Sequence, residues 1–198
     1  MHEVVVLIPG YSRWTREGKQ RAGGTVTLIK GTPNVIVDTG APEQQQELLS
    51  ALAGQGLGPE DIGWVVLTHG HLDHVGNNNL FPRATFVLES DISRNGEYWT
   101  HEFDRAPLQI ENTAGGAPLK VIPTRGHTDH CLSVLVESSI GRVAVVGDLF
   151  GHDGDWVDNI WHEYTRDRGL QQRSRDAILA TADHIVPGHG PMFRVRKD

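Results

Sequence analysis

The segment His69-Gly70-His71-Leu72-Asp73-His74 is the richest source of chemistry in the chain. Three imidazoles and one carboxylate in six consecutive residues offer nitrogen and oxygen ligands that suit zinc, iron or manganese. The segment directly follows the apolar run 64–67, so we expect it on a loop at the end of a buried strand, where a rigid scaffold presents functional groups. The pattern predicts a metal site. The alternative is a polar surface loop whose histidines cap a neighbouring helix.

Three later positions share one local arrangement. His127, Asp148 and His189 each stand directly after a glycine, close behind the end of an apolar run. Glycine lets the backbone turn sharply, which allows the next side chain to point into a shared cleft. Each residue alone would more often be structural than functional. Together with the first cluster, the three predict convergence on one site.

The remaining pattern indicates two batches of strands, each followed by a helix. Strands are expected at 4–8, 25–29, 35–37, 64–67, 85–88, 119–122, 133–136, 142–146 and 184–186, and helices at 42–54, 74–80 and 167–182. Residues 11–24 are expected to form a loop, and residues 91–118 have no clean periodicity. This order predicts an α/β fold in which two packed sheets carry helices on their outer faces, an αββα sandwich forming a single domain over residues 1–198.

Composition narrows the classes of partner and compartment. The 18 Lys and Arg residues against 25 Asp and Glu residues give a net charge of −7, so no global field attracts nucleic acid or an anionic membrane, and only a local basic patch is left open. The single cysteine, Cys131, excludes an internal disulfide framework and is expected to be a small buried thiol. With no basic leader and no membrane-length apolar run, we expect a cytoplasmic protein without a membrane partner.

Two further groups are candidates for substrate binding. The segment 12–21 places an aromatic side chain among cations, which suits a nucleic-acid base and its phosphates but equally describes a solvated loop. His130, close behind His127, is either a substrate contact or a structural residue. The candidates in the segment 12–21 are Arg13, Trp14, Arg16, Lys19 and Arg21.

These motifs, in this order, resemble those of the metallo-β-lactamase superfamily over about residues 4–193, nearly the whole chain. The resemblance is carried by Val37-Asp38-Thr39-Gly40, Thr68-His69-Gly70-His71, Asn79-Leu80-Phe81-Pro82 and Val186-Pro187-Gly188-His189-Gly190-Pro191. It implies the αββα sandwich and a ligand set similar to that of the glyoxalase II group.

The resemblance also implies a role for each ligand. It assigns His69, His71 and His127 to a first metal and Asp73, His74 and His189 to a second, with Asp148 bridging the two. Asp38 resembles the acid that orients a ligand from behind.

The implied chemistry is hydrolysis by a hydroxide that bridges two divalent ions about 3.5–4 Å apart. Zinc is the first expectation for these ions, with iron or manganese as alternatives. Asp73 is expected to act both as a ligand and as a catalytic proton acceptor.

The substrate is less constrained, because one fold hosts many chemistries. The group within the superfamily that this chain most resembles implies a phosphodiesterase, an endoribonuclease acting on RNA. A thioester or lactone hydrolase is the main alternative. A mononuclear iron persulfide dioxygenase would use His69, His127 and Asp148, and a non-catalytic metal-binding module would use the same ligands without turnover. The expected partner is a small molecule or RNA, and a homodimer is left open. In a eukaryote, the protein would also have access to the nucleus.

Overall fold

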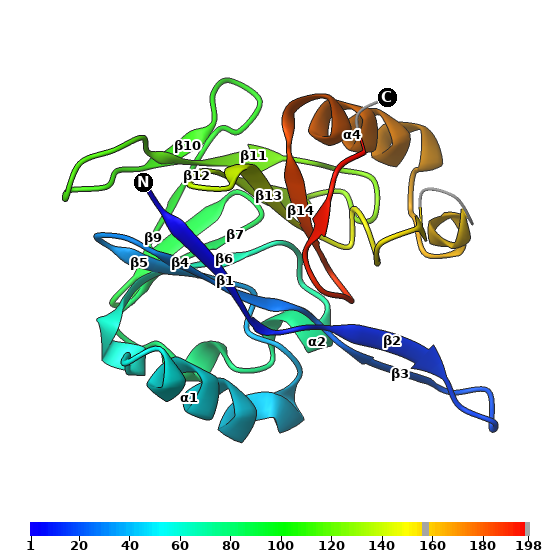
Figure 1. Ribbon diagram of the computed structural model, residues 1–198, viewed down its shortest axis with the longest axis horizontal. Helices are drawn as coiled ribbons and strands as arrows, with labels where there is room; N and C mark the ends of the chain where they lie inside the picture. The colour runs from blue at the N-terminus through cyan, green and yellow to red at the C-terminus, as the bar shows by residue number, and fades with distance from the viewer. Residues whose placement is uncertain (156–158, 197–198) are drawn as a thin grey trace.

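In the computed structural model, which describes residues 1–155 and 159–196, two mixed sheets pack face to face (Figure 1). The first sheet has the order β1 (Glu3–Ile8), β4 (Val26–Lys30), β5 (Asn34–Val37), β6 (Ile62–Leu67), β7 (Thr85–Leu88), β8 (Asp91–Arg94), β9 (Glu97–Thr100). The second has the order β10 (Leu108–Ile110), β11 (Leu119–Pro123), β12 (Leu132–Ser138), β13 (Gly141–Gly147), β14 (His184–Pro187), β15 (Phe193–Arg194).

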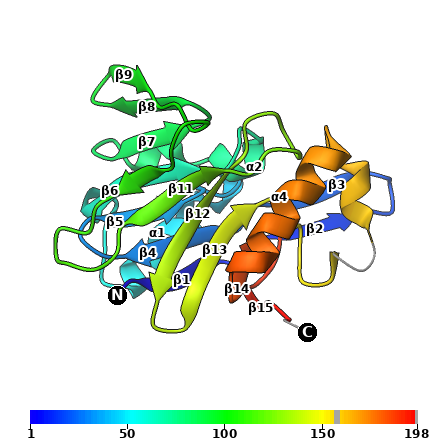
Figure 2. The same ribbon diagram turned by 90° about the horizontal axis from the view of Figure 1, so that it is seen from above.

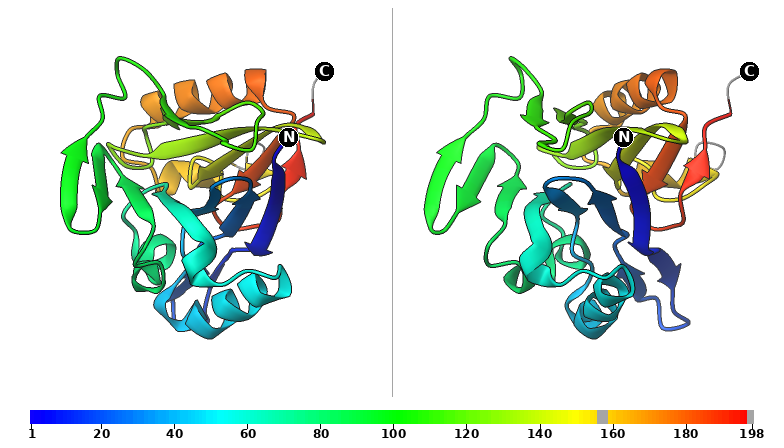
Figure 3. Two further views of the ribbon diagram at one scale, coloured as in Figure 1. Left: turned by 90° about the vertical axis from the view of Figure 1, so that its left-hand side faces the viewer. Right: turned by 60° about the vertical axis from the view of Figure 1, so that its left-hand side comes forward.

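Helices cover the outer face of each sheet, as the side views show (Figure 3). Helix α1 (Gln45–Gly54) follows the 3-10 turn η1 (Pro42–Gln44) and lies on the first sheet. Helix α4 (Arg168–Thr181) lies on the second sheet and begins at Asp167, whose side chain accepts a hydrogen bond from the Leu170 amide. The short elements are α2 (Leu72–Val75), η2 (Pro59–Asp61), η3 (Asn78–Leu80) and η4 (Ile160–Glu163).

Three apolar clusters hold these four layers together. The cluster between the sheets joins Val37 and Val66 of the first sheet to Val134 of the second. A second cluster lies between the first sheet and Leu48 of α1, and a third lies between the second sheet and Ile178 of α4. The predicted αββα sandwich is therefore confirmed.

Parallel strands at the centre of each sheet aim their ends at one place. Strands β5, β6 and β7 run parallel in the first sheet, and β13 and β14 run parallel in the second. The view from above shows the second sheet in front of the first, with β14 beside β13 and beneath α4 (Figure 2). The loops that leave their carboxyl ends carry Asp38, the 69–74 segment, Asp148 and His189.

The predictions for residues 74–80 and 11–24 were wrong: the helix expected at 74–80 is the short helix α2 followed, after two residues, by the 3-10 turn η3. Residues 11–24 are not a loop but a hairpin, β2 (Tyr11–Trp14) paired with β3 (Gln20–Gly23), that extends away from the body (Figure 1). Most of its side chains are exposed, so it has no apolar periodicity to detect, and Gly18 with φ of 72° makes the turn. Residues 91–118 contain β8, β9 and β10, where exposed edge residues again leave no clean alternation.

Within the described residues, no helix is both long and apolar enough to span a membrane.

Candidate metal centre

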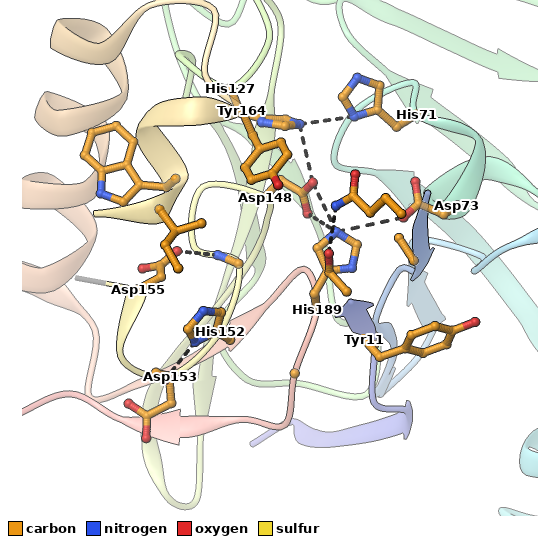
Figure 4. Close-up of a pocket in the computed structure, with 18 of the residues that line it drawn as sticks. Tyr11, His71, Asp73, His127, Asp148, His152, Asp153, Asp155, Tyr164 and His189 are labelled. Atoms are coloured by element: carbon orange, nitrogen blue, oxygen red, sulfur yellow. Dashed lines mark hydrogen bonds and ion pairs between the residues drawn. The ribbon is translucent and has the colours of Figure 1, made fainter. Parts of the chain in front are cut away.

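The first ligand group combines the end of β6 with two loops of the second sheet. It contains His69, His71, His127 and Asp148, whose ligand atoms all lie within 4.8 Å of one another. Nδ1 of His71 is 2.8 Å from Nε2 of His69 and 3.1 Å from Nε2 of His127. The nitrogens of these three imidazoles therefore lie close together, and Figure 4 shows the contact between His71 and His127.

The second ligand group lies beside the first and contains Asp73, His74 and His189. Helix α2 carries Asp73 and His74, and His189 follows β14. The Oδ2 atom of Asp73 is 4.0 Å from Nε2 of His74 and 3.8 Å from Nε2 of His189. The structure thus brings a carboxylate from one sheet to imidazoles from both.

Asp148 stands between the two groups. Its Oδ1 atom is 3.2 Å from Nε2 of His74 and 3.2 Å from Nε2 of His189. Its Oδ2 atom is 3.4 Å from Nε2 of His127 and 3.8 Å from Nε2 of His69. Oδ2 also lies 3.3 Å from Nε2 of His189, so the carboxylate contacts both ligand groups, as a bridging carboxylate must.

Two unsatisfied atoms test whether these residues fit metal ions. Nε2 of His74 and Oδ1 of Asp148 are buried without a hydrogen-bond partner. Buried polar atoms are normally hydrogen-bonded, so orphaned ones need an explanation. A cation between them satisfies both, and the nitrogen and oxygen donors match the ligands of zinc and similar divalent ions. The residues fit.

Electrostatics at the centre follow from burial and from the shared carboxylate. Burial and the neighbouring imidazoles of His74 and His127 hold the pKa of His69 well below its ordinary value, which keeps the ring neutral as metal ligation requires. Burial acts to raise the pKa of Asp148, but the imidazoles of His189 and His74 hold that pKa well below its ordinary value. The bridging group is therefore an anion.

Asp38 supports the centre from behind. It follows β5 with a φ of 57°, and its carboxylate accepts hydrogen bonds from the Thr68 amide and the Thr68 hydroxyl, each 2.7 Å long. Nδ1 of His74 lies 2.7 Å from Oδ2 of the same carboxylate. Since the carboxylate engages Nδ1, Nε2 of His74 faces the ligand group. The structure thus places Asp38 where it can orient a ligand.

Backbone groups and α4 position the ligands of the second sheet. Nδ1 of His189 is 3.2 Å from the Gly23 carbonyl, and the His127 carbonyl accepts a hydrogen bond from the Arg166 amide over 3.3 Å. The Gln171 side-chain amide donates to the Asp148 carbonyl over 3.1 Å. A Cβ atom on Gly188 would overlap the Asp148 carboxylate, so only glycine fits there.

A pocket of about 720 Å³ opens from the ligands. His71, Asp73, His127, Asp148 and His189 line its inner end. Among the described residues that line it, none is Lys or Arg. Its outer wall contains Tyr11, Trp14, Ile160, Trp161, Tyr164 and Pro191.

The predicted substrate-binding residues fall in different places. Trp14 lines the pocket with Ser12, Gln20 and Ala22. In the register of the hairpin, Ser12 pairs with Ala22 and Trp14 with Gln20, whereas Arg13 pairs with Arg21. Neither arginine lines the pocket, although Tyr11, two positions before Arg13 on the same strand, does. The Arg13 guanidinium lies over the Tyr11 ring, 5.4 Å from its centroid, and Arg16 and Lys19 lie at the hairpin turn outside the pocket.

The other two residues considered beside the site do not line its pocket. His130 lines a second cavity of about 530 Å³ with Glu89 and Arg125. Cys131 is buried as expected, and burial raises its pKa to about 11, so it is an unreactive thiol.

Sequence reasoning missed most of the pocket wall. Ile160, Trp161 and Tyr164 lie on and just after η4, in a stretch without strand or long-helix periodicity. Gln171 reaches the pocket from α4, where the helical pattern gave no reason to single out a polar residue. The concentration of aromatic residues between 156 and 164 was the one available signal.

Fold and ligand set together define a metallo-hydrolase. The model of the metallo-beta-lactamase superfamily matches residues 21–189, and the chain belongs to this superfamily. Metallo-beta-lactamase domain-containing protein 1 of Xenopus laevis is 45% identical over 197 residues, covering 99% of this chain and 83% of the relative. The protein of the same name from Homo sapiens is 37% identical, covering 100% of this chain and 84% of the relative.

Solved structures share the fold. One from Thermotoga maritima, assigned to the metallo-beta-lactamases, superposes with a TM-score of 0.71 at 23% identity and covers 98% of this chain and 99% of its own. An N-acyl homoserine lactone hydrolase with bound product superposes with a TM-score of 0.65 at 17% identity, covering 95% and 92%. At these identities the likeness concerns the fold. With the family match, it makes the chain a metal-dependent hydrolase.

Proposed function

We propose that the chain hydrolyses an ester-type bond, in a thioester or lactone, of a small molecule with an apolar acyl group. One observation carries this proposal. The pocket of about 720 Å³ ends at the ligands, and its lining is largely apolar, with the carboxylates of Asp153 and Asp155 but without Lys or Arg among the described lining residues. Pockets of this size bury a small ligand, and an apolar wall favours an acyl group over a string of phosphates.

The role of each residue in this proposal follows from its position in the site. When two divalent ions are bound, the first expectation being zinc, they supply an acidified water and stabilise negative charge on oxygen. The seven ligands would hold these ions, with His69, His71 and His127 around one and Asp73, His74 and His189 around the other. The Asp148 carboxylate contacts imidazoles of both groups.

Asp73 and Asp38 have supporting roles in this mechanism. Asp73 is partly exposed at the inner end of the pocket, so its carboxylate is placed to accept a proton there. Asp38 holds His74 in one orientation through the 2.7 Å contact at Nδ1.

The second candidate is phosphodiester hydrolysis of RNA, as an endoribonuclease. The observation that favours it is the exposed hairpin, where Trp14 stands at the pocket and Arg13 and Arg21 lie outside it. A base stacked on Trp14 with phosphates along the cations is the arrangement this candidate needs. The net charge of −7 opposes it.

One substrate panel decides between the two candidates. Protein loaded with zinc is assayed on acetyl and octanoyl thioesters, on an N-acyl homoserine lactone and on single-stranded RNA. We expect turnover of an acyl substrate that is unchanged in an Arg13→Ser/Arg21→Ser variant and insensitive to salt. RNA cleavage that falls steeply with salt, with a smaller salt slope in that variant and no acyl hydrolysis, would overturn the proposal in favour of RNA.

A further inference from the structure

One hydrogen bond joins two segments at the outer edge of the pocket. Nε1 of Trp14, in the hairpin, donates to the hydroxyl of Tyr164 over 3.2 Å. The two residues are 150 positions apart in the sequence, and both line the pocket. Trp14 is 62% exposed and Tyr164 is 37% exposed. We name this pair the aromatic bridge.

Both ends of the aromatic bridge are tied to metal ligands. At the base of the hairpin, the Gly23 carbonyl faces Nδ1 of His189 at 3.2 Å, and the Gly24 amide donates to the Asp73 carbonyl over 3.0 Å. At the other end, two residues beyond Tyr164, the Arg166 amide donates to the His127 carbonyl over 3.3 Å. The bridge therefore has a fixed position relative to the ligands, and a group held under it has a fixed distance from the reacting bond.

A role in stabilising the fold does not explain why these two aromatic rings are exposed at the pocket. An intramolecular hydrogen bond contributes only about 0.5–1.5 kcal/mol net, and less is expected where water competes. Neither ring is buried by the rest of the chain. Tryptophan and tyrosine combine a large apolar face with a polar tip and few rotatable bonds, which suits contact with a ligand. The apolar side chains of Ile160 and Trp161 continue the same wall.

We infer that the aromatic bridge is the specificity determinant of this site. Trp14 and Tyr164 cover the apolar acyl chain of the substrate, so chains of medium length gain contacts that an acetyl group cannot reach. This inference rests on the proposed acyl hydrolysis. On this inference Trp14 binds the substrate and selects its chain length, and it does not contact the reacting atoms.

The test compares chain lengths in three variants. Acetyl and octanoyl thioesters of N-acetylcysteamine are assayed with wild-type protein, Trp14→Ala, Tyr164→Phe and the control Trp99→Ala, whose ring is 45% exposed on β9. We expect Trp14→Ala to raise KM for the octanoyl substrate about tenfold or more, equivalent to about 1.4 kcal/mol. In Trp14→Ala, KM for the acetyl substrate and kcat for both substrates should stay within about threefold of wild type. Tyr164→Phe should raise KM for the octanoyl substrate alone, and by less. Trp99→Ala should match wild type.

A binding measurement separates this inference from the proposed function. Calorimetry with octanoate, the acyl product, reads the pocket without turnover. If wild-type protein hydrolyses neither these thioesters nor the N-acyl homoserine lactone, the proposed function fails, and octanoate binding that weakens about tenfold in Trp14→Ala still supports the aromatic bridge. Equal KM changes for both chain lengths, unchanged KM for octanoyl, or octanoate binding equal in wild type and Trp14→Ala would overturn the inference. Because Trp14 is exposed, we expect no folding defect in Trp14→Ala, and thermal unfolding of this variant checks the expectation.

Discussion

The two halves of the metal centre are built in different ways. The first sheet contributes four ligands from the single segment 69–74, whereas the second contributes His127, Asp148 and His189 from three separate loops. The halves meet through backbone bonds, with the Leu132 amide donating to the Thr68 carbonyl over 2.8 Å. A contiguous motif can form by local geometry, but three loops converge only when a sheet and its covering helix hold them.

The supports differ accordingly. One carboxylate, Asp38, braces the first half through Thr68 and His74. The second half depends on α4, where Gln171 bonds the Asp148 carbonyl and buried Arg175 bonds the Leu149 carbonyl and pairs with Asp155 at 2.7 Å. The first half is thus held by one carboxylate that follows the neighbouring strand β5, and the second by hydrogen bonds and an ion pair from helix α4.

Removing the shared carboxylate is expected to have the largest effect. Asp148→Asn keeps the shape of the side chain but removes the anion that faces both groups. Turnover should fall by more than the roughly 100-fold typical for residues that only orient a ligand. Elemental analysis and turnover measure this, and circular dichroism verifies the fold. A variant that keeps full metal content and near-normal turnover would show that the halves do not share Asp148.

The next effect is on stability, in the second half alone. In Arg175→Met, Asp155 is left as a buried, uncompensated charge, which costs about 3–5 kcal/mol. Denaturant unfolding measures the loss. The double variant Arg175→Met/Asp155→Leu should recover part of it, because apolar replacement of a buried pair is often neutral. A loss below about 1 kcal/mol in the single variant would mean that α4 does not brace this half through the ion pair.

The support of the first half predicts a moderate functional effect. Asp38→Asn retains a residue that tolerates the φ of 57° but removes the negative charge behind His74. Zinc affinity or turnover should fall about 10- to 100-fold, with little change in unfolding free energy relative to Arg175→Met. Competition with a chromophoric chelator gives the affinity. Equal destabilisation by both variants would remove the contrast between the carboxylate support of the first half and the helix support of the second.

The smallest effect is expected at Cys131, beside the second half. Its pKa of about 11 leaves the thiol protonated near neutral pH, and it is absent from both ligand groups among the described residues. Cys131→Ser should keep turnover within a few-fold, and native wild-type protein should react with iodoacetamide at pH 8 far more slowly than unfolded protein. Rapid native labelling blocked by bound zinc would instead identify Cys131 as part of the centre.

The same contrast explains what the sequence could and could not reveal. The spacing from His69 to His74 marks a metal site without any knowledge of the fold, and glycine before His127, Asp148 and His189 adds a weaker signal. The structure brings all seven together. The pocket wall could not be predicted from the sequence. Trp14 and Tyr164 are 150 positions apart, and exposed hairpins lack the apolar alternation that marks buried strands.

Metal content tests the central claim most directly, since the account requires two ligand groups that share Asp148. Protein purified without added metal is stripped with a chelator, titrated with zinc, passed over a desalting column and measured by elemental analysis. We expect two zinc ions per wild-type chain. In Asp148→Asn, we expect a weak chelator to remove both ions together. One firmly held iron and no second ion, even after metal addition, would contradict it and favour a mononuclear oxygenase built on His69, His127 and Asp148.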